Sequence, residues 1–182
     1  MEKSDKQLLT EFLAGSDASF EQLVQRYLKP IYNFLYQFTK DKDTLDDLTQ
    51  ETFVKAWKNL EKFDRKKNFK TWLYTIAKNT AYDYLKKKKT VPFSFFENEA
   101  GNNHLENIPE ENPLPDEIVF RKDLEKDLEK KLQALPDNYR ILLMMRYKDD
   151  FSLQEIAEIL NLPYNTVKSQ HARALVNLKK TF

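Results

Sequence analysis

The segment between Phe63 and Lys89 is the part of this chain whose residue types best fit a binding chemistry. Six aromatic residues alternate there with nine lysines or arginines, against two acids. Aromatic rings stack on unpaired nucleic-acid bases, contributing roughly 1 to 3 kcal/mol each, while cations neutralise the phosphates. The segment therefore predicts binding of single-stranded nucleic acid. A second interpretation stays open for each ring, because aromatic side chains at helical spacing also form the core of helical domains.

The composition indicates a helical protein that must position these residues. Of the 182 residues, 41 % are hydrophobic and 13 % aromatic, which is enough to bury a core. Two glycines and long stretches rich in Leu, Lys, Glu and Ala predict an all-α fold. The lack of cysteine excludes disulfides and thiolate metal sites. No stretch approaches the ~20 apolar residues of a membrane span and no leader segment is evident, so we expect a cytoplasmic protein with no membrane insertion.

Acidic residues are concentrated in the middle of the chain. Residues 91–120 contain seven Asp or Glu, four prolines and no Lys or Arg, although the whole chain has a net charge of +1. Prolines among Asn and Glu residues interrupt any helical period. We therefore expect two small, basic helical domains, residues 1–89 and 116–182, joined by an acidic flexible linker at 90–115. A tether whose charge serves solubility is one interpretation of this linker.

Apolar periodicity predicts four helices before the linker. The first covers about 6–14. The second begins at Asp17 and is expected to break near Pro30, because proline removes an amide donor and clashes one turn back. The third covers about 43–59, and the fourth follows the N-cap Asn68 and ends near Lys87. On the fourth helix, the predicted buried stripe is Phe69, Trp72, Leu73, Ile76, Ala77, Thr80 and Tyr84, and the predicted outer face is Thr71, Thr75, Lys78, Asn79, Tyr82 and Lys86.

The segment after the linker predicts a helix-turn-helix. A leucine stripe ends a helix at Pro136, and an apolar run at 141–145 marks a buried helix over about 137–147. Ser152 and Glu155 form a capping box, and Asn161 suits the left-handed conformation at a bend. The helix after this bend can enter a major groove of DNA. An ordinary helical hairpin is the alternative.

Four segments together resemble the extracytoplasmic-function sigma factors, group 4 of the bacterial sigma-70 family. They are DLTQETFVKAW at 47–57, FDRKKNFKTWLYTIAKNTAYDYL at 63–85, LPDNYR at 135–140 and SLQEIAEILNLPYNTVKS at 152–169. They occur in the family's order and span nearly the whole chain outside the linker. The resemblance implies a region 2 helical bundle followed by a region 4 helix-turn-helix domain.

The resemblance assigns part of the third helix to RNA polymerase. It implies that the clamp helices of the polymerase's largest subunit bind Asp47, Gln50, Glu51 and Phe53. Without the family, the acids at this helical spacing are a solvated face. An enzyme using the carboxylates of Asp43, Asp46, Asp47 and Glu51 would need metal, but the Glu-x-x-His spacing of helical di-metal sites is absent.

The resemblance also divides the aromatic and basic segment. It implies that the loop at 63–70 forms a pocket for a base flipped out of the −10 promoter element, and that the outer face of the following helix reads and melts that element. Extruding a base costs a few kcal/mol. Lysines 86–89 would hold backbone phosphates, or be merely solvated. The residues assigned to single-stranded DNA are Phe63, Arg65, Lys66, Lys67, Asn68, Lys70, Thr75, Lys78, Asn79, Tyr82 and Lys86.

The last helix is expected to read the duplex −35 element. The assigned residues are Asn165, Thr166, Ser169, Gln170 and Arg173 for bases or groove, and Lys168 for phosphate. The chain departs from the family pattern at three positions, with Asn165 in place of Gly and Gln170 and His171 in place of Arg and Leu. Glutamine can pair with adenine where arginine prefers guanine, so the −35 specificity is expected to differ. We place His171 on the buried stripe, packed or half-exposed.

The function that follows is a promoter-specificity subunit that is not itself an enzyme and needs no cofactor or metal. The partners implied are core RNA polymerase, promoter DNA in duplex and single-stranded form, and an anti-sigma factor, often membrane-anchored in this family. The family also implies a role in a stress response. The acidic linker would thread the polymerase channel as a nucleic-acid mimic. The alternative is a stand-alone helix-turn-helix regulator, a class that usually dimerises on paired half-sites.

Overall fold

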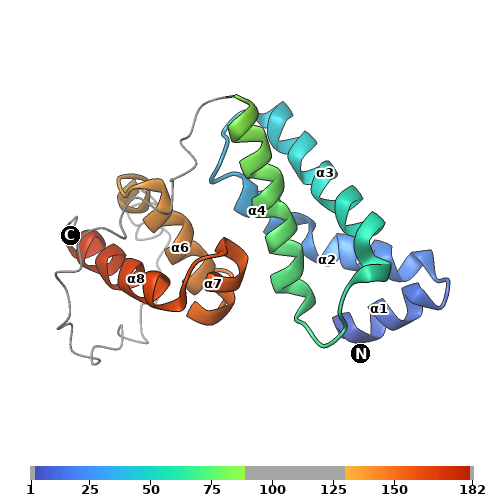
Figure 1. Cartoon of the computed structure of the whole chain (residues 1–182). Helices are drawn as coiled ribbons and strands as arrows, with labels where there is room; N and C mark the ends of the chain where they lie inside the picture. The colour runs from blue at the N-terminus through green and yellow to red at the C-terminus, as the bar shows by residue number, and fades with distance from the viewer. Residues whose placement is uncertain (1–2, 89–129, 181–182) are drawn as a thin grey trace. The chain divides into compact units, whose positions relative to one another are not determined.

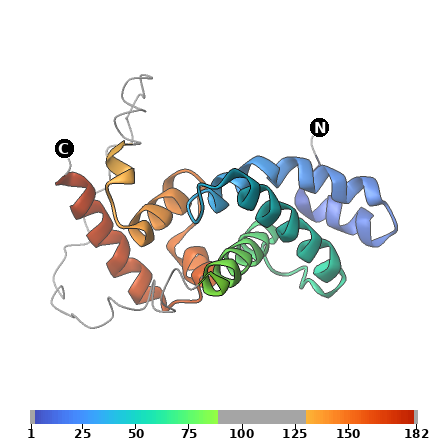
Figure 2. The ribbon, with the colours of Figure 1, turned by 90° about the horizontal axis from the view of Figure 1, so that it is seen from above.

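The chain folds as two compact helical units in a computed structural model that describes residues 3–88 and 130–180 (Figure 1). The predicted linker at 90–115 and Lys89 lie outside the described residues. The elements of the N-terminal unit are α1 (Asp5–Leu13), α2 (Asp17–Leu35), α3 (Lys42–Asn59), the short 3-10 helix η1 (Leu60–Lys62) and α4 (Phe69–Lys87). Figures 1 and 2 show α1 folded back along the first part of α2, against which it packs. The all-α prediction is confirmed.

Side-chain caps determine where these helices begin. Asn68 Oδ1 accepts a hydrogen bond from the Thr71 amide at 3.2 Å, which confirms the predicted N-cap of α4. Asp41 does the same for α3, through the Thr44 amide at 3.0 Å. Each of these bonds satisfies an amide that has no partner within its helix, and such caps stabilise a helix by about 1 kcal/mol.

Helix α2 is continuous through Pro30, so the prediction of a break there is wrong. The missing amide leaves the helix one backbone bond short, a cost of about 3 kcal/mol or more in a helix interior. Tyr27, Ile31 and Phe34 are buried on either side of the proline. Burying one large apolar side chain contributes about 1.5 to 3 kcal/mol, so these residues together offset the proline.

Helix α4 packs against both α2 and α3, and it is therefore buried on more than one stripe. The Tyr74 ring lies 5.0 Å from the Phe34 ring of α2, and Lys55 of α3 donates to the Thr80 hydroxyl at 3.2 Å. Tyr74 and Ala81, which the predicted stripe omitted, are buried. Thr71 is buried as well, although it was predicted on the outer face. A single amphipathic stripe could not reveal a helix with two neighbours.

The C-terminal unit contains a helical segment at 130–133, α6 (Asp137–Tyr147), α7 (Leu153–Leu160) and α8 (Tyr164–Lys179). The predicted bounds of α6 are confirmed, and four of its five residues at 141–145 are buried, Met144 being half-buried. Helix α6 packs against α8 through a cluster formed by Leu135, Tyr139, Leu143 and Ala174. Of the leucine stripe predicted before Pro136, Leu124 and Leu128 lie outside the described residues, while Leu132 and Leu135 pack in this cluster.

None of the described helices is both long and apolar enough to cross a membrane.

Candidate functional site

An aromatic cluster supports the basic loop that precedes α4. The ring of Phe63 lies 4.8 Å from the Trp72 ring and 5.9 Å from the Phe69 ring, and Phe69 in turn contacts Tyr27 of α2. Phe63 is 8 % exposed. Its assignment as a DNA-contacting residue is therefore corrected: Phe63 belongs to the core of the N-terminal unit. The rings of Phe69 and Trp72 pack against it, a contact that the loop sequence alone could not reveal.

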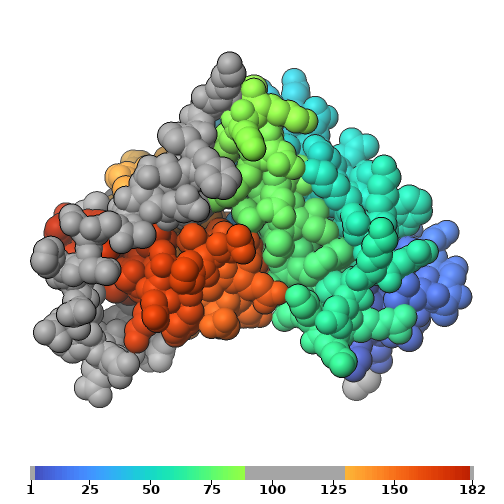
Figure 3. Space-filling view, in the orientation of Figure 1, coloured from blue at the N-terminus to red at the C-terminus, as the bar shows by residue number. Residues whose placement is uncertain are grey.

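The loop itself is exposed and carries three neighbouring cations. Residues 64–68 all lie on the surface, among them Arg65, Lys66 and Lys67. Asp64 organises the loop, because its side chain accepts from the Lys66 amide at 3.0 Å and its carbonyl accepts from the Lys67 amide at 2.9 Å. The cations therefore extend from a hydrogen-bonded turn anchored on aromatic side chains. The loop and α4 are visible together on one face of the N-terminal unit in Figure 3.

The predicted outer face of α4 is only partly accessible. Asn79 and Lys86 are exposed, while Thr75, Tyr82 and Lys70 are half-buried. Lys78 is 6 % exposed and its ammonium lies 5.2 Å from the centre of the Tyr82 ring. Burial lowers the pKa of Lys78 and raises that of Tyr82. The assignment of Lys78 to an accessible DNA-binding face is thus corrected, since a lysine stem packs readily along apolar surface.

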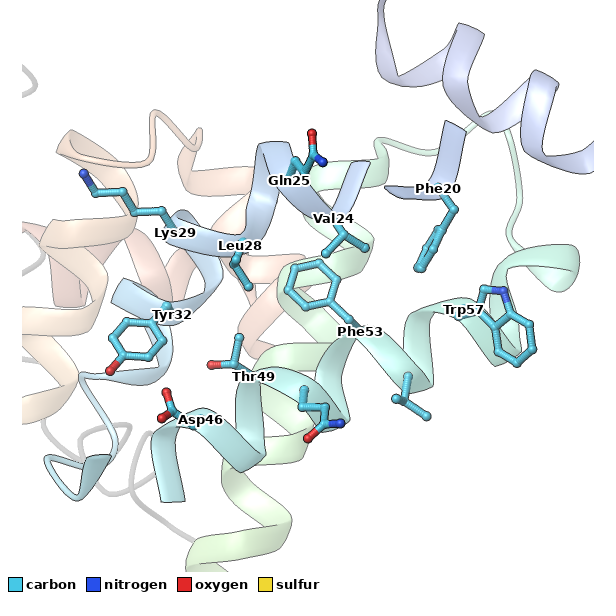
Figure 4. A pocket seen from close by; sticks show the side chains of 12 residues that line it. Phe20, Val24, Gln25, Leu28, Lys29, Tyr32, Asp46, Thr49, Phe53 and Trp57 are labelled. Carbon is cyan, nitrogen blue, oxygen red and sulfur yellow. The ribbon is translucent and has the colours of Figure 1, made fainter. Parts of the chain in front are cut away.

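The acidic residues of α3 border an apolar groove. Asp47, Gln50 and Glu51 are exposed, as predicted for a docking face, and Phe53 is nearly buried. Phe53 lines a groove of about 810 Å³ between α2 and α3. Figure 4 shows Val24, Leu28 and Phe53 pointing toward one another, with Tyr32 and Asp46 at one end and Phe20 and Trp57 at the other.

Several groove residues were missed by sequence reasoning. Leu28, Val54 and Trp57 are exposed large hydrophobic residues, Trp57 with 53 % of its surface accessible. Trp57 follows Phe53 by four residues, a spacing that places both on one side of α3. This four-residue spacing is the feature of the sequence from which the apolar side of the groove could have been predicted. Among the described residues, no cluster of acids or histidines is arranged to hold a metal ion.

The helix-turn-helix forms as its local sequence predicts. The Ser152 hydroxyl accepts from the Glu155 amide at 3.2 Å, and the Glu155 carboxylate accepts from the Ser152 amide at 2.9 Å, which confirms the capping box. Asn161 has a φ of 56°, the left-handed conformation predicted for the bend. Ala157 is buried, as a small residue between close helices should be. Helix α8 then starts directly after Pro163.

The exposed face of α8 differs from the prediction at Gln170. Asn165 and Lys168 are exposed, and Thr166, Ser169 and Arg173 are half-buried. Gln170 is 1 % exposed, so its assignment as a base-reading residue is corrected. The buried side of α8 consists of Val167, Gln170 and Ala174, and His171 lies at its edge.

His171 instead pairs with a tyrosine of α6. Its Nε2 atom lies 3.0 Å from the Tyr147 hydroxyl, and the two rings are 5.8 Å apart. The pKa of His171 is lowered, chiefly by burial and also by the positive charge of Arg146. The half-exposed placement expected for this histidine is confirmed. The neutral imidazole thus connects the end of α6 to α8.

Comparison with known proteins identifies the family. Residues 23–91 match the family Sigma-70 region 2, and residues 125–178 match Sigma-70, region 4. The chain is 34 % identical to the ECF RNA polymerase sigma factor SigW of Bacillus subtilis (strain 168), over 99 % of this chain and 97 % of that relative. The chain belongs to the extracytoplasmic-function sigma factors. It is therefore a promoter-specificity subunit of RNA polymerase and not itself an enzyme.

Other relatives agree with this assignment. The ECF RNA polymerase sigma-E factor of Escherichia coli (strain K12) is 31 % identical, with 94 % of this chain and 90 % of that relative covered. Among solved structures, the sigma factor RpoE of Bartonella quintana, in complex with the anti-sigma factor NepR, matches with a TM-score of 0.63 at 25 % identity, over 89 % of this chain and 95 % of that one. CnrH, solved with the cytosolic domain of CnrY, shares the fold of this sigma factor, with a TM-score of 0.66 at 23 % identity over 98 % and 96 % of the two chains.

Proposed function

We propose that this sigma factor directs core RNA polymerase to promoters by reading the −35 element with its C-terminal unit and the −10 element with its N-terminal unit. The observation that carries the proposal is the presence of two different nucleic-acid surfaces on separate units. One is the exposed side of α8 in a helix-turn-helix, and the other is a basic loop anchored on an aromatic cluster. The first suits duplex DNA and the second suits DNA whose bases are unpaired.

The groove between α2 and α3 is the proposed docking site for polymerase. An apolar floor that includes Phe53, with the carboxylate of Asp46 at its edge, fits an amphipathic helix whose polar side is basic. Asp47, Gln50 and Glu51 continue the acidic edge along the exposed side of α3. Apolar contact would supply affinity, and the carboxylates would fix the orientation of the partner helix.

The loop at 64–70 and the accessible part of α4 are proposed to hold the melted −10 element. Arg65, Lys66 and Lys67 supply three exposed cations within one turn of chain. Flipping a base costs a few kcal/mol, which these charges and the loop must offset. Phe63 contributes by supporting the loop rather than by stacking. The contact residues in this proposal are Arg65, Lys66, Lys67, Asn68, Lys70, Thr75, Asn79, Tyr82 and Lys86.

The exposed face of α8 is proposed to read the −35 element. Asn165 and Lys168 are the most accessible of the assigned residues, and Thr166, Ser169 and Arg173 lie beside them. Arginine bonds two acceptors of guanine and asparagine pairs with adenine, so Arg173 and Asn165 are the specific readers. Lys168 binds phosphate. Gln170, being buried, influences this surface through the placement of α8.

Two further assignments depend on the family. We infer that residues 1–89 and 116–182 are the two binding units and that residues 90–115 connect them, with the protein acting in the cytoplasm, where core polymerase resides. RpoE of Bartonella quintana was solved with the anti-sigma factor NepR, and we infer that an anti-sigma factor also holds this chain inactive.

Run-off transcription with core polymerase and genomic fragments tests the function. The expected result is new initiation sites that require this protein, together with a stable complex with core. Initiation unchanged by the protein and no complex with core would overturn the proposal. A stable dimer in gel filtration that binds duplex promoter DNA tightly without polymerase would favour the stand-alone regulator instead.

A further inference from the structure

Five exposed lysines meet where the end of α4 lies beside the start of α3. Lys40 and Lys42 come from the turn between α2 and α3 and its junction with α3, and Lys86, Lys87 and Lys88 come from the end of α4. Figure 1 shows the end of α4 beside the start of α3. The Tyr84 hydroxyl lies 3.5 Å from the Thr44 hydroxyl and so joins the two segments. We call these five residues the lysine cluster. The family resemblance suggested a role for its α4 members, but not for Lys40 and Lys42.

Two ammonium groups of the cluster are held against aromatic rings. The Nζ atom of Lys40 lies 3.6 Å from the centre of the Tyr36 ring and donates to the Tyr36 carbonyl at 3.0 Å. The Nζ atom of Lys88 lies 4.8 Å from the centre of the Tyr84 ring. Cation–π contacts restrict a lysine side chain. A restricted cation loses less entropy when it binds.

Nearby acids do not neutralise the cluster. Asp41 and Asp43 flank Lys42, and Asp83 lies one turn before Lys86 and Lys87 on α4, so five positive charges face three negative ones. The Asp41 carboxylate accepts from the amide and the hydroxyl of Thr44, which lowers its pKa. This carboxylate caps α3 and also attracts the ammonium of Lys88, but one carboxylate does not cancel the excess of lysines. The remaining surface attracts a polyanion.

The position of the cluster identifies which part of the DNA it meets. The basic loop lies before the first residue of α4, and the cluster lies at its other end. A helix of 19 residues is roughly 28 Å long at 1.5 Å per residue. At roughly 3.4 Å per base pair, that length corresponds to about eight base pairs of duplex. The cluster is therefore beyond the reach of a base held at the loop.

We propose that Lys40 and Lys42, together with Lys87 and Lys88 at the end of α4, bind backbone phosphates of the duplex DNA that adjoins the melted −10 element. The proposal rests on the promoter function above and adds a third DNA contact, made by the turn between α2 and α3. The contact is independent of sequence, because ammonium groups on phosphates read charge and spacing. Its role is to anchor the duplex at the edge of the melted segment.

The test uses the full chain bound to core polymerase and the double variant Lys40→Gln/Lys42→Gln. Affinity is measured against salt on two templates, one with duplex adjoining the −10 element and one carrying that element only as a single strand. Each phosphate contact contributes about 0.9 to the slope of log affinity against log salt. The expected result is a slope reduced by about 2 on the duplex template and unchanged on the single strand.

The matched control is Lys6→Gln/Lys58→Gln, which removes two exposed lysines from α1 and the end of α3. It is expected to leave both slopes unchanged. An unchanged slope on the duplex template for the cluster variant overturns the proposal, and so does an equal reduction on both templates. Weaker binding to core with unchanged DNA slopes would mean that the cluster contacts protein, which also overturns it. Failure of the promoter function itself is distinguishable, because the unsubstituted chain would then give no initiation.

Discussion

The ammonium of Lys55 lies 2.9 Å from the Glu51 carboxylate, one turn away on α3. The same ammonium donates to the Thr80 hydroxyl on α4 at 3.2 Å. A proposed polymerase-docking residue therefore shares one lysine with the helix that is proposed to contact DNA. Both partners of the ion pair are substantially exposed, so the pair orients Glu51 more than it stabilises the fold.

Reversing the acidic docking face should abolish polymerase binding without unfolding the protein. Asp47→Lys/Glu51→Lys replaces two exposed carboxylates with cations, and exposed ion pairs contribute only about 0 to 1 kcal/mol to stability. Pull-down with core polymerase and thermal melting measure the two effects. Asp17→Lys/Glu21→Lys, on the exposed surface of α2, is a matched charge control. Retained core binding by the first variant would remove this face from the docking site.

Removal of the Phe63 ring should destabilise the N-terminal unit. Phe63→Ala leaves a cavity among the Phe69 and Trp72 rings, and such truncations cost about 3 to 5 kcal/mol. Urea unfolding measures the loss. Arg65→Ala in the adjoining exposed loop should keep full stability and lose affinity for single-stranded −10 DNA. A Phe63→Ala protein as stable as the parent would return Phe63 to the DNA-binding surface.

Gln170 and Arg173 should separate into a structural and a DNA-binding role. Gln170→Ala removes a buried side chain and leaves a cavity, which is expected to lower stability by about 1 to 3 kcal/mol. Arg173→Ala should weaken binding to the duplex −35 element and leave opening on a pre-melted template unchanged. Denaturant unfolding and a comparison of the two templates measure these effects. Equal loss on both templates for Arg173→Ala would show that Arg173 is structural.

Loss of the capping box should weaken α7. Ser152→Ala removes the hydroxyl that accepts from the Glu155 amide, which is expected to cost about 1 kcal/mol of stability. Ser152→Asp retains an acceptor at the same position and should restore most of it. Thermal denaturation of both variants checks the pair. Identical melting temperatures for Ser152→Ala and the parent would contradict the prediction.

His171 should make the C-terminal unit less stable in acid. Its pKa is lowered in the folded state, so the unfolded chain binds more protons once the pH falls below about 6.5, and stability declines there. His171→Gln cannot titrate and should lose less stability between pH 7.5 and pH 5.5 than the parent. Urea midpoints at the two pH values give the comparison. Other titrating groups are common to both proteins, and parallel losses would mean that His171 does not contribute.

Much of the C-terminal unit could be predicted because its signals are local. The capping box, the left-handed Asn161 and the buried run at 141–145 each depend on residues a few positions apart. The four sequence segments likewise identified the family, because their residues and their order along the chain match those of the family. Local chemistry and motif order do not depend on which helix lies beside which.

Only the tertiary structure decided which flanking side chains became core. At about 100° per residue, Gln170 and His171 lie roughly 50° to either side of the line through Val167 and Ala174. The apolar period therefore does not predict which of the two is buried. The packing of α8 buries Gln170 and leaves His171 to pair with Tyr147. The burial of Phe63 and the continuity of α2 through Pro30 were likewise decided by tertiary packing. Each depends on neighbours distant in the chain, whose burial free energy outweighs the local preference.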